Sequence, residues 1–265
     1  MALDALTKSL LEIGESDIQR AMRYQRAWAY YKAEEYLGEL GKRYAQEQKL
    51  FRHMRRAFGY VTQCVDTDAR FVMQERLGVD AEEAFATDIY EVWERSNLQA
   101  HKYKLARFGC NLGDAFLIVS DVGDGGRVVP RIIVANTEDM TVWRDPDDES
   151  EIIRARQTYT YLGTDGKAHS RTWLYYPDVV ERYTDDKLDE GFPRAHPFGE
   201  VPVIPIRAID IGEEHGLCSW HNVQGQLDQV NELGSYFNRI LLRYADPQLM
   251  GIGMMPGEQP SIRRG

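Results

Sequence analysis

The chain has 265 residues, of which 43% are hydrophobic and 28% charged, and its formal net charge is -10. This composition is ordinary for a folded soluble protein, and the length suffices for one large domain or two modest ones. The acidity argues against a protein whose whole surface grips duplex DNA, because the phosphate backbone attracts basic surfaces. A surface that DNA slides past without sticking remains compatible with it.

Two features of the sequence concern its location. No run approaches the roughly 18 apolar residues that a membrane span requires. Asp4 stands where a signal peptide would be basic, and no long apolar core follows it. We therefore expect a protein that has no membrane partner and is made and kept in the cytoplasm.

Residues 1–112 have the periodicity of helices. Between residues 15 and 40 the pattern repeats at spacings of three and four, and Ser16 is the expected N-cap. A second pattern runs from Leu50 to Val72. A third begins after Asp80, and a glycine at 109 or 113 is expected to end it. The first part of the chain is therefore predicted to be a helical layer.

Residues 113–208 change to the period of strands. The runs "AFLIVSD" and "RVVPRIIVA" are joined by "VGDGGR", which predicts a hairpin because glycine tolerates positive φ. Pro130 indicates an edge strand or a bulge. A third strand is expected at "MTVWRDP", and "EIIRARQTYTYL" with "RTWLYYP" predicts a second hairpin. The run "DVVERYTDD" fits either a further strand or a short helix.

The stretch "HPFGEVPVIPIRA", residues 196–208, combines β-forming side chains with three prolines. Each proline removes a backbone N–H and fixes φ. This run therefore cannot be a central strand that is hydrogen-bonded on both sides.

Residues 209–246 contain the longest helical pattern. A helix from about 217 to 245 would be roughly 40 Å long. Its apolar side chains alternate at spacings of three and four, which is typical of a helix seam that packs against a partner helix. The seam consists of Trp220, Val223, Leu227, Val230, Phe237, Leu241 and Tyr244, with Gly234 between them. The partner would come from the upstream helices or from another copy of the chain.

Motifs that carry chemistry are weak throughout. His215, Cys218 and His221 are three residues apart and could supply zinc ligands with His196, but the start of a helix explains them better. The run "VGDGGR" lacks the ending of a phosphate loop, and "DPDDESE" lacks the glycine and spacing of a calcium loop. No nucleophile motif is present. We therefore expect no enzyme, with no catalytic residue, cofactor or metal.

Two basic helical stretches, "RHMRRAF" and "KYKLARF", carry aromatic residues between their charges. These charges could contact phosphates. The favoured alternative is that they balance neighbouring acidic residues on a helix surface. The candidate phosphate-contacting residues are Arg52, Arg55, Arg56, Lys102 and Lys104.

In order and character, residues from about 55 to about 250 resemble the portal proteins of tailed bacteriophages. The most specific parts are "HPFGEVPVIPI" and the Asn/Gln-rich helix "QGQLDQVNELGSYFNRILLRYADPQLMG". Proteins of this family form a ring, usually of twelve copies, at one vertex of the capsid, through which DNA is packaged and ejected. The resemblance implies a structural subunit of this homo-oligomer, located at the capsid portal vertex of the virion and assembled in the host cytoplasm.

The resemblance also implies an α+β fold in four parts. Residues 1–112 would be the helical wing region and 113–208 the antiparallel β-rich wing region. Residues 209–246 would be a long C-terminal stem-like helix, and 247–265 the start of the clip or a flexible tail. The family continues with a clip, a second stem helix, a tunnel loop and a crown, whereas this sequence ends at "MGIGMMPGEQPSIRRG". The proline-rich stretch would be the rigid lead-in to the stem-like helix.

Residue roles and partners follow from the same resemblance. Asp228 and Glu232 would face the channel, where acidic groups repel phosphate and keep DNA sliding. The expected partners are double-stranded DNA, the large terminase subunit, which would hydrolyse ATP, the major capsid and scaffold proteins, and the head-completion or adaptor proteins that provide tail attachment. Two alternatives stay open. One is a cytosolic enzyme with an unrecognised site in the β-rich segment, and the other is a monomeric virion adaptor protein.

Overall fold

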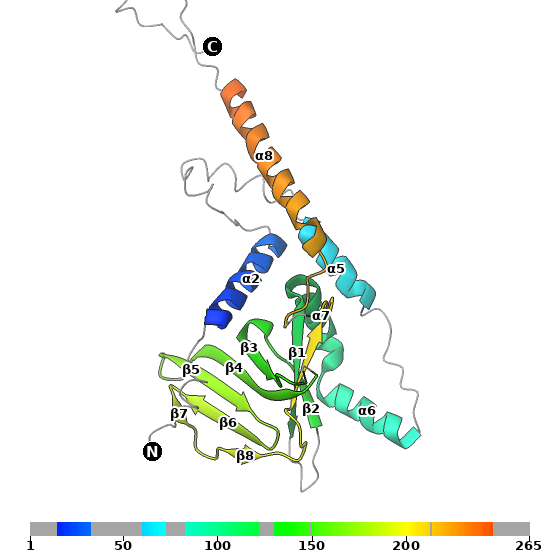
Figure 1. Ribbon diagram of the computed structural model, residues 1–265, viewed down its shortest axis with the longest axis vertical. Coiled ribbons are helices and arrows are strands. Elements are labelled where there is room, and N and C mark those ends of the chain that lie inside the picture. Colours follow the sequence, from blue (N-terminus) through cyan, green and yellow to red (C-terminus); the bar gives the residue numbers. More distant parts are fainter. Residues whose placement is uncertain are drawn as a thin grey trace, which may run out of the picture. The chain divides into compact units, whose positions relative to one another are not determined.

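The computed structural model of the chain combines helices with antiparallel sheets (Figure 1). The structure describes residues 15–32, 60–72, 83–121, 130–148, 150–212 and 214–245. These residues belong to two compact units. Unit 1 holds residues 15–32 and 60–222, and unit 2 holds residues 223–245. The predicted α+β class is confirmed.

In the described residues of unit 1, four helices precede or contact the sheets: α2 (Glu15–Tyr31), α5 (Tyr60–Val72), α6 (Glu83–Arg95) and α7 (Leu98–Leu112). Tyr24 and Val65 are completely buried, and Phe108 is nearly so. The predicted N-cap is wrong, because α2 already includes Glu15 and Ser16 lies inside its first turn. Such ends shift easily by one or two residues.

The predicted third helix is two helices in the structure. Asn97 has a φ of 50°, in the left-handed region, and separates α6 from α7. The end of α7 is as predicted. Gly113 has a φ of 90° and its amide donates to the carbonyl of Gly109, which is a glycine cap.

A three-stranded sheet lies next to the helices, in the order β2 (Pro130–Val134), β1 (Asp114–Asp121), β9 (Val203–Arg207). Both outer strands run antiparallel to β1. Within the described residues β9 pairs only with β1, and Pro205 stands opposite Phe116. The proline-bearing stretch is therefore not a central strand, as predicted, and within the described residues its part 203–207 forms an edge strand. β2 is also an edge strand and begins at Pro130, whereas the turn at 122–129 lies outside the described residues.

The second sheet is built from β3 (Met140–Arg144), β4 (Ile152–Leu162), β5 (Ala168–Tyr175), β6 (Val179–Thr184) and β7 (Lys187–Leu188), in that order, and β8 (Arg194–Ala195) pairs with β6. The short helix η1 (Thr137–Asp139) precedes β3. The predicted hairpin of β4 and β5 is confirmed, with Gln157 opposite Trp173. The run "DVVERYTDD" forms a strand, β6, and not a helix.

The core lies between the two sheets. Phe116, Ile118 and Val203 face it from the three-stranded sheet, and Met140 and Ala155 face it from the other. Met140 has no exposed surface. Burying a side chain of this size contributes about 1.5–3 kcal/mol, so the contact between the sheets is the main apolar stabilisation of this region.

A buried polar cluster ties α2 to the edge of the six-stranded sheet. Asp17 forms ion pairs with both Arg20 and Arg156, and the hydroxyl of Thr141 donates to the same carboxylate at 2.9 Å. The Asp17 and Arg156 side chains are 9% and 4% exposed. Because a buried charge without a partner is costly, this cluster fixes where the start of α2 lies on the sheet.

In unit 2 the structure describes one helix, α8 (Gln224–Ala245), directly after the short helix η2 (His221–Val223). The helix starts seven residues later than the predicted residue 217. The backbone amides of Leu217 and Ser219 donate instead to the carbonyls of Ile209 and Cys110 in unit 1. Among the described residues, no helix combines the length and hydropathy needed to cross a membrane.

Candidate functional site

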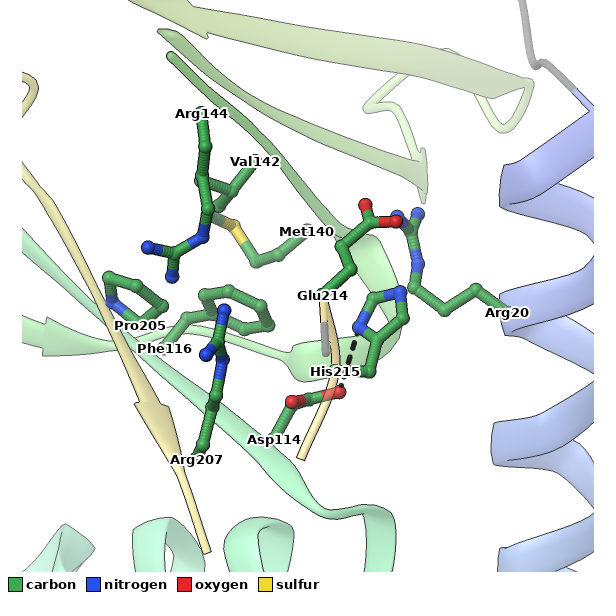
Figure 2. Close-up of a pocket in the computed structure, with 10 residues that line it drawn as sticks. All are labelled: Arg20, Asp114, Phe116, Met140, Val142, Arg144, Pro205, Arg207, Glu214 and His215. Atoms are coloured by element: carbon green, nitrogen blue, oxygen red, sulfur yellow. Dashed lines mark hydrogen bonds and ion pairs between the residues drawn. The ribbon is translucent and has the colours of Figure 1, made fainter. Parts of the chain in front are cut away.

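The segment that leads into α8 is held to unit 1 by the carboxylate of Asp114, the first residue of β1. The side chain of Asp114 is 4% exposed. It accepts hydrogen bonds from the Tyr24 hydroxyl and the Arg23 guanidinium at 2.7 Å, and from the Gly216 amide at 2.8 Å. His215 Nδ1 lies 3.1 Å away (Figure 2). One carboxylate thus connects α2, β1 and residues 215–216, and we call this set the Asp114 anchor.

The protonation states follow from these contacts. Burial alone would raise the pKa of Asp114, but the hydrogen bonds from His215, Gly216 and Tyr24 outweigh it, and the pKa is lowered. Burial, followed by the nearby charge of Asp114, raises the pKa of Tyr24. The carboxylate is therefore ionised and Tyr24 keeps its proton. Because an ionised carboxylate only accepts, Nδ1 of His215 is the donor in this contact.

Beside the Asp114 anchor, the backbone at Gly113 lies in direct contact with the backbone at Gly216. A Cβ atom added to Gly216 would overlap the carbonyl oxygen of Gly113, and one added to Gly113 would overlap the carbonyl of Gly216. Ala208 donates its amide to the Gly113 carbonyl at 2.9 Å. Two glycines are needed because the end of α7 and the returning chain touch backbone to backbone.

Further contacts hold the segment up to residue 220. Leu217 pairs with Ile209 as an isolated bridge, and the Ser219 amide donates to the carbonyl of Cys110 at 2.9 Å. Trp220 is 4% exposed, donates from Nε1 to Asn111 at 3.3 Å, and its ring lies 5.1 Å from that of Tyr30. Trp220 is therefore a core residue of unit 1 that precedes α8. Its predicted place on the helix seam is corrected.

The residues considered as zinc ligands do not lie together in the structure. His215 bonds to Asp114, Cys218 is partly buried before α8, and His221 is exposed in η2. Across the described part of the chain, no three His, Cys, Asp or Glu side chains are arranged to hold a metal ion.

A small cavity of about 20 Å³ lies beside the anchor. Figure 2 shows its apolar floor and a rim of charged groups from α2, β3, β9 and the segment after β9. The lining residues are Arg20, Asp114, Phe116, Met140, Val142, Arg144, Pro205, Arg207, Glu214 and His215. We call this cavity the arginine recess. Sequence analysis did not identify it, because its three arginines come from positions 20, 144 and 207.

The other predicted seam residues lie in η2 or in α8. Val223 is the last residue of η2 and is 44% exposed, whereas in α8 Val230 is 38% exposed, Phe237 is 57% exposed and Leu227 is half-buried. The side chains of Leu241, Tyr244 and Glu232 lie outside the described residues. Asp228 is exposed. Leu233, Tyr236 and Ile240 add further exposed apolar surface, so the described part of α8 carries large apolar side chains facing solvent.

The candidate phosphate-contacting residues are only partly described. Arg52, Arg55 and Arg56 lie outside the described residues. Lys104 lies over the Phe108 ring, with its Nζ 3.5 Å from the carbonyl of Val134, and the Lys102 ammonium lies 5.3 Å from the Tyr103 ring. Both lysines therefore have neighbours within α7 or the sheet.

Comparison with known proteins adds one finding. The family model described as "Phage portal protein, SPP1 Gp6-like" matches residues 12–261 of the chain. None of the curated proteins is similar enough to count as a match. The match covers the helical region, both sheets, the Asp114 anchor and α8, so it applies to the whole described structure.

Proposed function

Because the chain belongs to the family of SPP1 Gp6-like phage portal proteins, we propose that it is a subunit of the ring at one capsid vertex through which double-stranded DNA is packaged and ejected. The observation that carries this proposal is the family match across residues 12–261. A portal role is structural, and it places the protein in the virion. The expected ring has twelve copies and provides the platform for tail attachment.

The exposed apolar side chains of α8 support self-assembly. Leu233, Phe237 and Ile240 are 66%, 57% and 51% exposed. Contiguous apolar surface on a helix indicates a protein contact, because soluble proteins rarely leave such surface uncovered. In a ring, each copy of α8 would contact the copies before and after it through head-to-tail interfaces, and these contacts would cover the apolar surface. In this arrangement α8 is the stem-like helix.

The acidic side chains of α8 suit a DNA channel. Asp228 is exposed, and Glu232 follows it one helical turn later. Carboxylates facing phosphates repel them, so a channel lined in this way allows DNA to slide. The large terminase subunit, which hydrolyses ATP, would drive this movement. The major capsid, scaffold and head-completion proteins would contact the outer parts of the ring.

The arginine recess is a cavity lined by charged side chains, which is the kind of feature that an enzyme would be expected to have. Its volume of about 20 Å³ has room for one or two water-sized groups. Of its two carboxylates, Asp114 is already bonded to four donors and Glu214 is exposed to solvent, and no Ser, Cys or Thr nucleophile lines it. These properties favour a structural or ligand-holding role over catalysis, in agreement with the portal proposal.

Light scattering and negative-stain microscopy of the purified chain test the proposal together. Rings with a central hole of DNA width, about 20 Å or more, and a mass of about twelve chains are the expected result. A monomer at all concentrations would contradict it. Cross-linking from positions 228 and 232 to packaged DNA then tests the channel assignment.

A further inference from the structure

The six-stranded sheet carries buried apolar side chains on both of its faces. Along a strand, side chains alternate between the two faces. Trp173 and Tyr175 of β5 pack in the core between the sheets, so Leu174 points to the opposite face, which we call the outer face. There Leu174 and Tyr183 of β6 pack together and are 2% and 4% exposed. A sheet face that buries such side chains needs a layer that covers it.

The first turn of α2 lies on this outer face. Arg156 of β4 follows a residue of the core between the sheets and therefore points outward. Asp17 forms an ion pair with Arg156 and accepts a hydrogen bond from Thr141 of β3. At the other end of α2, the Tyr31 hydroxyl donates to a residue of α5. The helix thus runs from the sheet to the other helices (Figure 1), and the chain that precedes Glu15 joins it at the sheet.

The contacts of Asp17 cover only the β3–β4 side of the outer face. Leu174 and Tyr183 lie on β5 and β6, beyond β4 in the order of strands. In the described chain, the apolar side chains that pack against this pair are Trp143 of β3 and Tyr176, which directly follows β5. Neither comes from a helix. The burial of the outer face therefore points to a covering segment outside the described ranges.

Residues 3–13 have the side-chain pattern of such a cover. Their larger apolar residues recur at spacings of three, four and three, and their charged residues at spacings of four. The apolar set is Leu3, Leu6, Leu10 and Ile13, and the charged set is Asp4, Lys8 and Glu12. On a helix these two sets fall on opposite sides. A helix of this length would be roughly 16 Å long, which matches the roughly 14 Å from the first to the last of four neighbouring strands.

We propose that residues 3–13 form an amphipathic helix whose leucine side docks on the outer face of the six-stranded sheet, over Leu174 and Tyr183. Gly14 permits a change of direction between this helix and α2. The segments 33–59 and 73–82 join helix to helix, from α2 to α5 and from α5 to α6, whereas residues 3–13 lead directly to the end of α2 that contacts the sheet. The charged side of the docked helix faces solvent. The inference concerns a single chain and does not depend on ring formation.

Photo-cross-linking in the full chain tests the position of the segment without removing a leucine. A benzophenone amino acid at position 9, where Ser9 borders the apolar side of the helix, should link to the peptide that contains residues 171–184. The same probe at position 8, on the charged side, is the matched control and should not. Mixing isotope-labelled with unlabelled chains shows whether a link joins residues of one chain. No link to this peptide, or a link only between different chains, would overturn the proposal.

Thermal melting gives a second measurement. The double variant Leu6→Ala with Leu10→Ala should lower the melting temperature by roughly 5 °C or more, because two buried side chains lose their contacts. The matched pair Asp4→Ala with Lys8→Ala should change it by no more than about 2 °C. Equal melting of the two double variants would contradict the docked helix.

A mutant cycle identifies the contacted face. Leu6→Ala combined with Leu174→Ala should lower the melting temperature by less than the sum of the two single changes, because both remove the same contact. Val65→Ala, at a completely buried position of α5, is the control and should add fully to Leu6→Ala. Full additivity with Leu174→Ala would mean that the segment lies elsewhere.

Discussion

The amide of Gly216 donates to Oδ1 of Asp114 at 2.8 Å, across 102 positions of the sequence. This bond and the 3.1 Å contact of the same carboxylate with His215 fix the chain just before α8 to the start of β1. The segment before α8 is thus tied to α2 and β1 through one carboxylate that has four donors.

Replacing Asp114 with asparagine should lower the free energy of unfolding by about 2–4 kcal/mol, because a neutral amide cannot accept from four donors in a buried position. Urea unfolding followed by circular dichroism measures this change. The control Asp178→Asn alters an exposed aspartate on the surface and should stay within about 0.5 kcal/mol of the unaltered protein. Equal losses for both variants would contradict the assigned role of the anchor.

The difference in unfolding free energy between the unaltered protein and Asp114→Asn should depend on pH in a defined direction. The pKa of Asp114 is lowered from its ordinary value of 3.8 because, although burial raises it, the bonds from His215, Gly216 and Tyr24 outweigh burial. The stabilisation is therefore present above pH 3.8 and is lost as the pH falls through the folded-state pKa. Unfolding series of the unaltered protein and Asp114→Asn should converge below pH 3.8. A difference that stays constant down to pH 2 would refute the assignment.

Alanine at position 216 should be tolerated poorly, because its Cβ would overlap the carbonyl oxygen of Gly113. We expect a loss of about 1–3 kcal/mol in unfolding free energy, which is typical of an overpacked contact. Gly225→Ala is the matched control, since a Cβ there meets nothing within 4 Å. Calorimetric melting of both variants checks this. A stable Gly216→Ala protein would mean that the two backbone segments do not cross so closely.

His169 should titrate above its ordinary pKa of 6.5, since the protonated ring donates hydrogen bonds to the carboxylates of Asp185 and then Asp165, which favour its charged form. Its Nδ1 lies 2.6 Å from Asp185, and its Nε2 lies 3.1 Å from Asp165. The stabilisation is fully present below pH 6.5 and is lost as the pH rises through the raised pKa. Proton NMR of the ring measures this directly.

Asp185→Asn should lower the titration midpoint of His169 toward 6.5. The neighbouring Asp186→Asn is the matched control, because Asp186 has the same left-handed backbone conformation and no contact with His169 is recorded for it. It should leave the midpoint nearly unchanged. The same midpoint in both variants would contradict the assigned effect of the Asp185 carboxylate on His169.

Phe237→Asp should weaken self-association about tenfold or more, because burying an unpaired carboxylate in an apolar helix contact is costly. Phe237 is 57% exposed in the described chain, so its replacement should leave the fold of a single subunit intact. Gln229→Asp adds the same charge at an exposed position of α8 and serves as the control. Light scattering across a concentration series compares the self-association of the two variants. Equal association of both would contradict the role of Phe237 in contacts between copies of α8.

The sequence by itself determined where helices give way to strands. Apolar residues recur every three or four positions in a helix with one buried face and every two positions in such a strand, and this spacing can be read locally. It also determined that residues 203–207 are not a central strand hydrogen-bonded on both sides. Proline at 205 lacks the N–H that a second neighbour would need, and this holds whatever the surrounding structure is. The end of α7 at Gly113 was predictable for a similar reason, since a left-handed cap favours glycine.

Only the tertiary structure decided which residues meet across long separations. The pattern of spacings placed Trp220 on the helix seam, but its bond to Asn111 buries it in unit 1 and delays α8 to residue 224. The sequence around Asp114, an aspartate before an apolar strand, does not reveal the anchor. The donors to its carboxylate lie about 90 residues before it and 100 residues after it. The arginine recess gave none, since three separate elements supply its charges. Local patterns record which face of an element is buried, and they carry no information on which partner buries it.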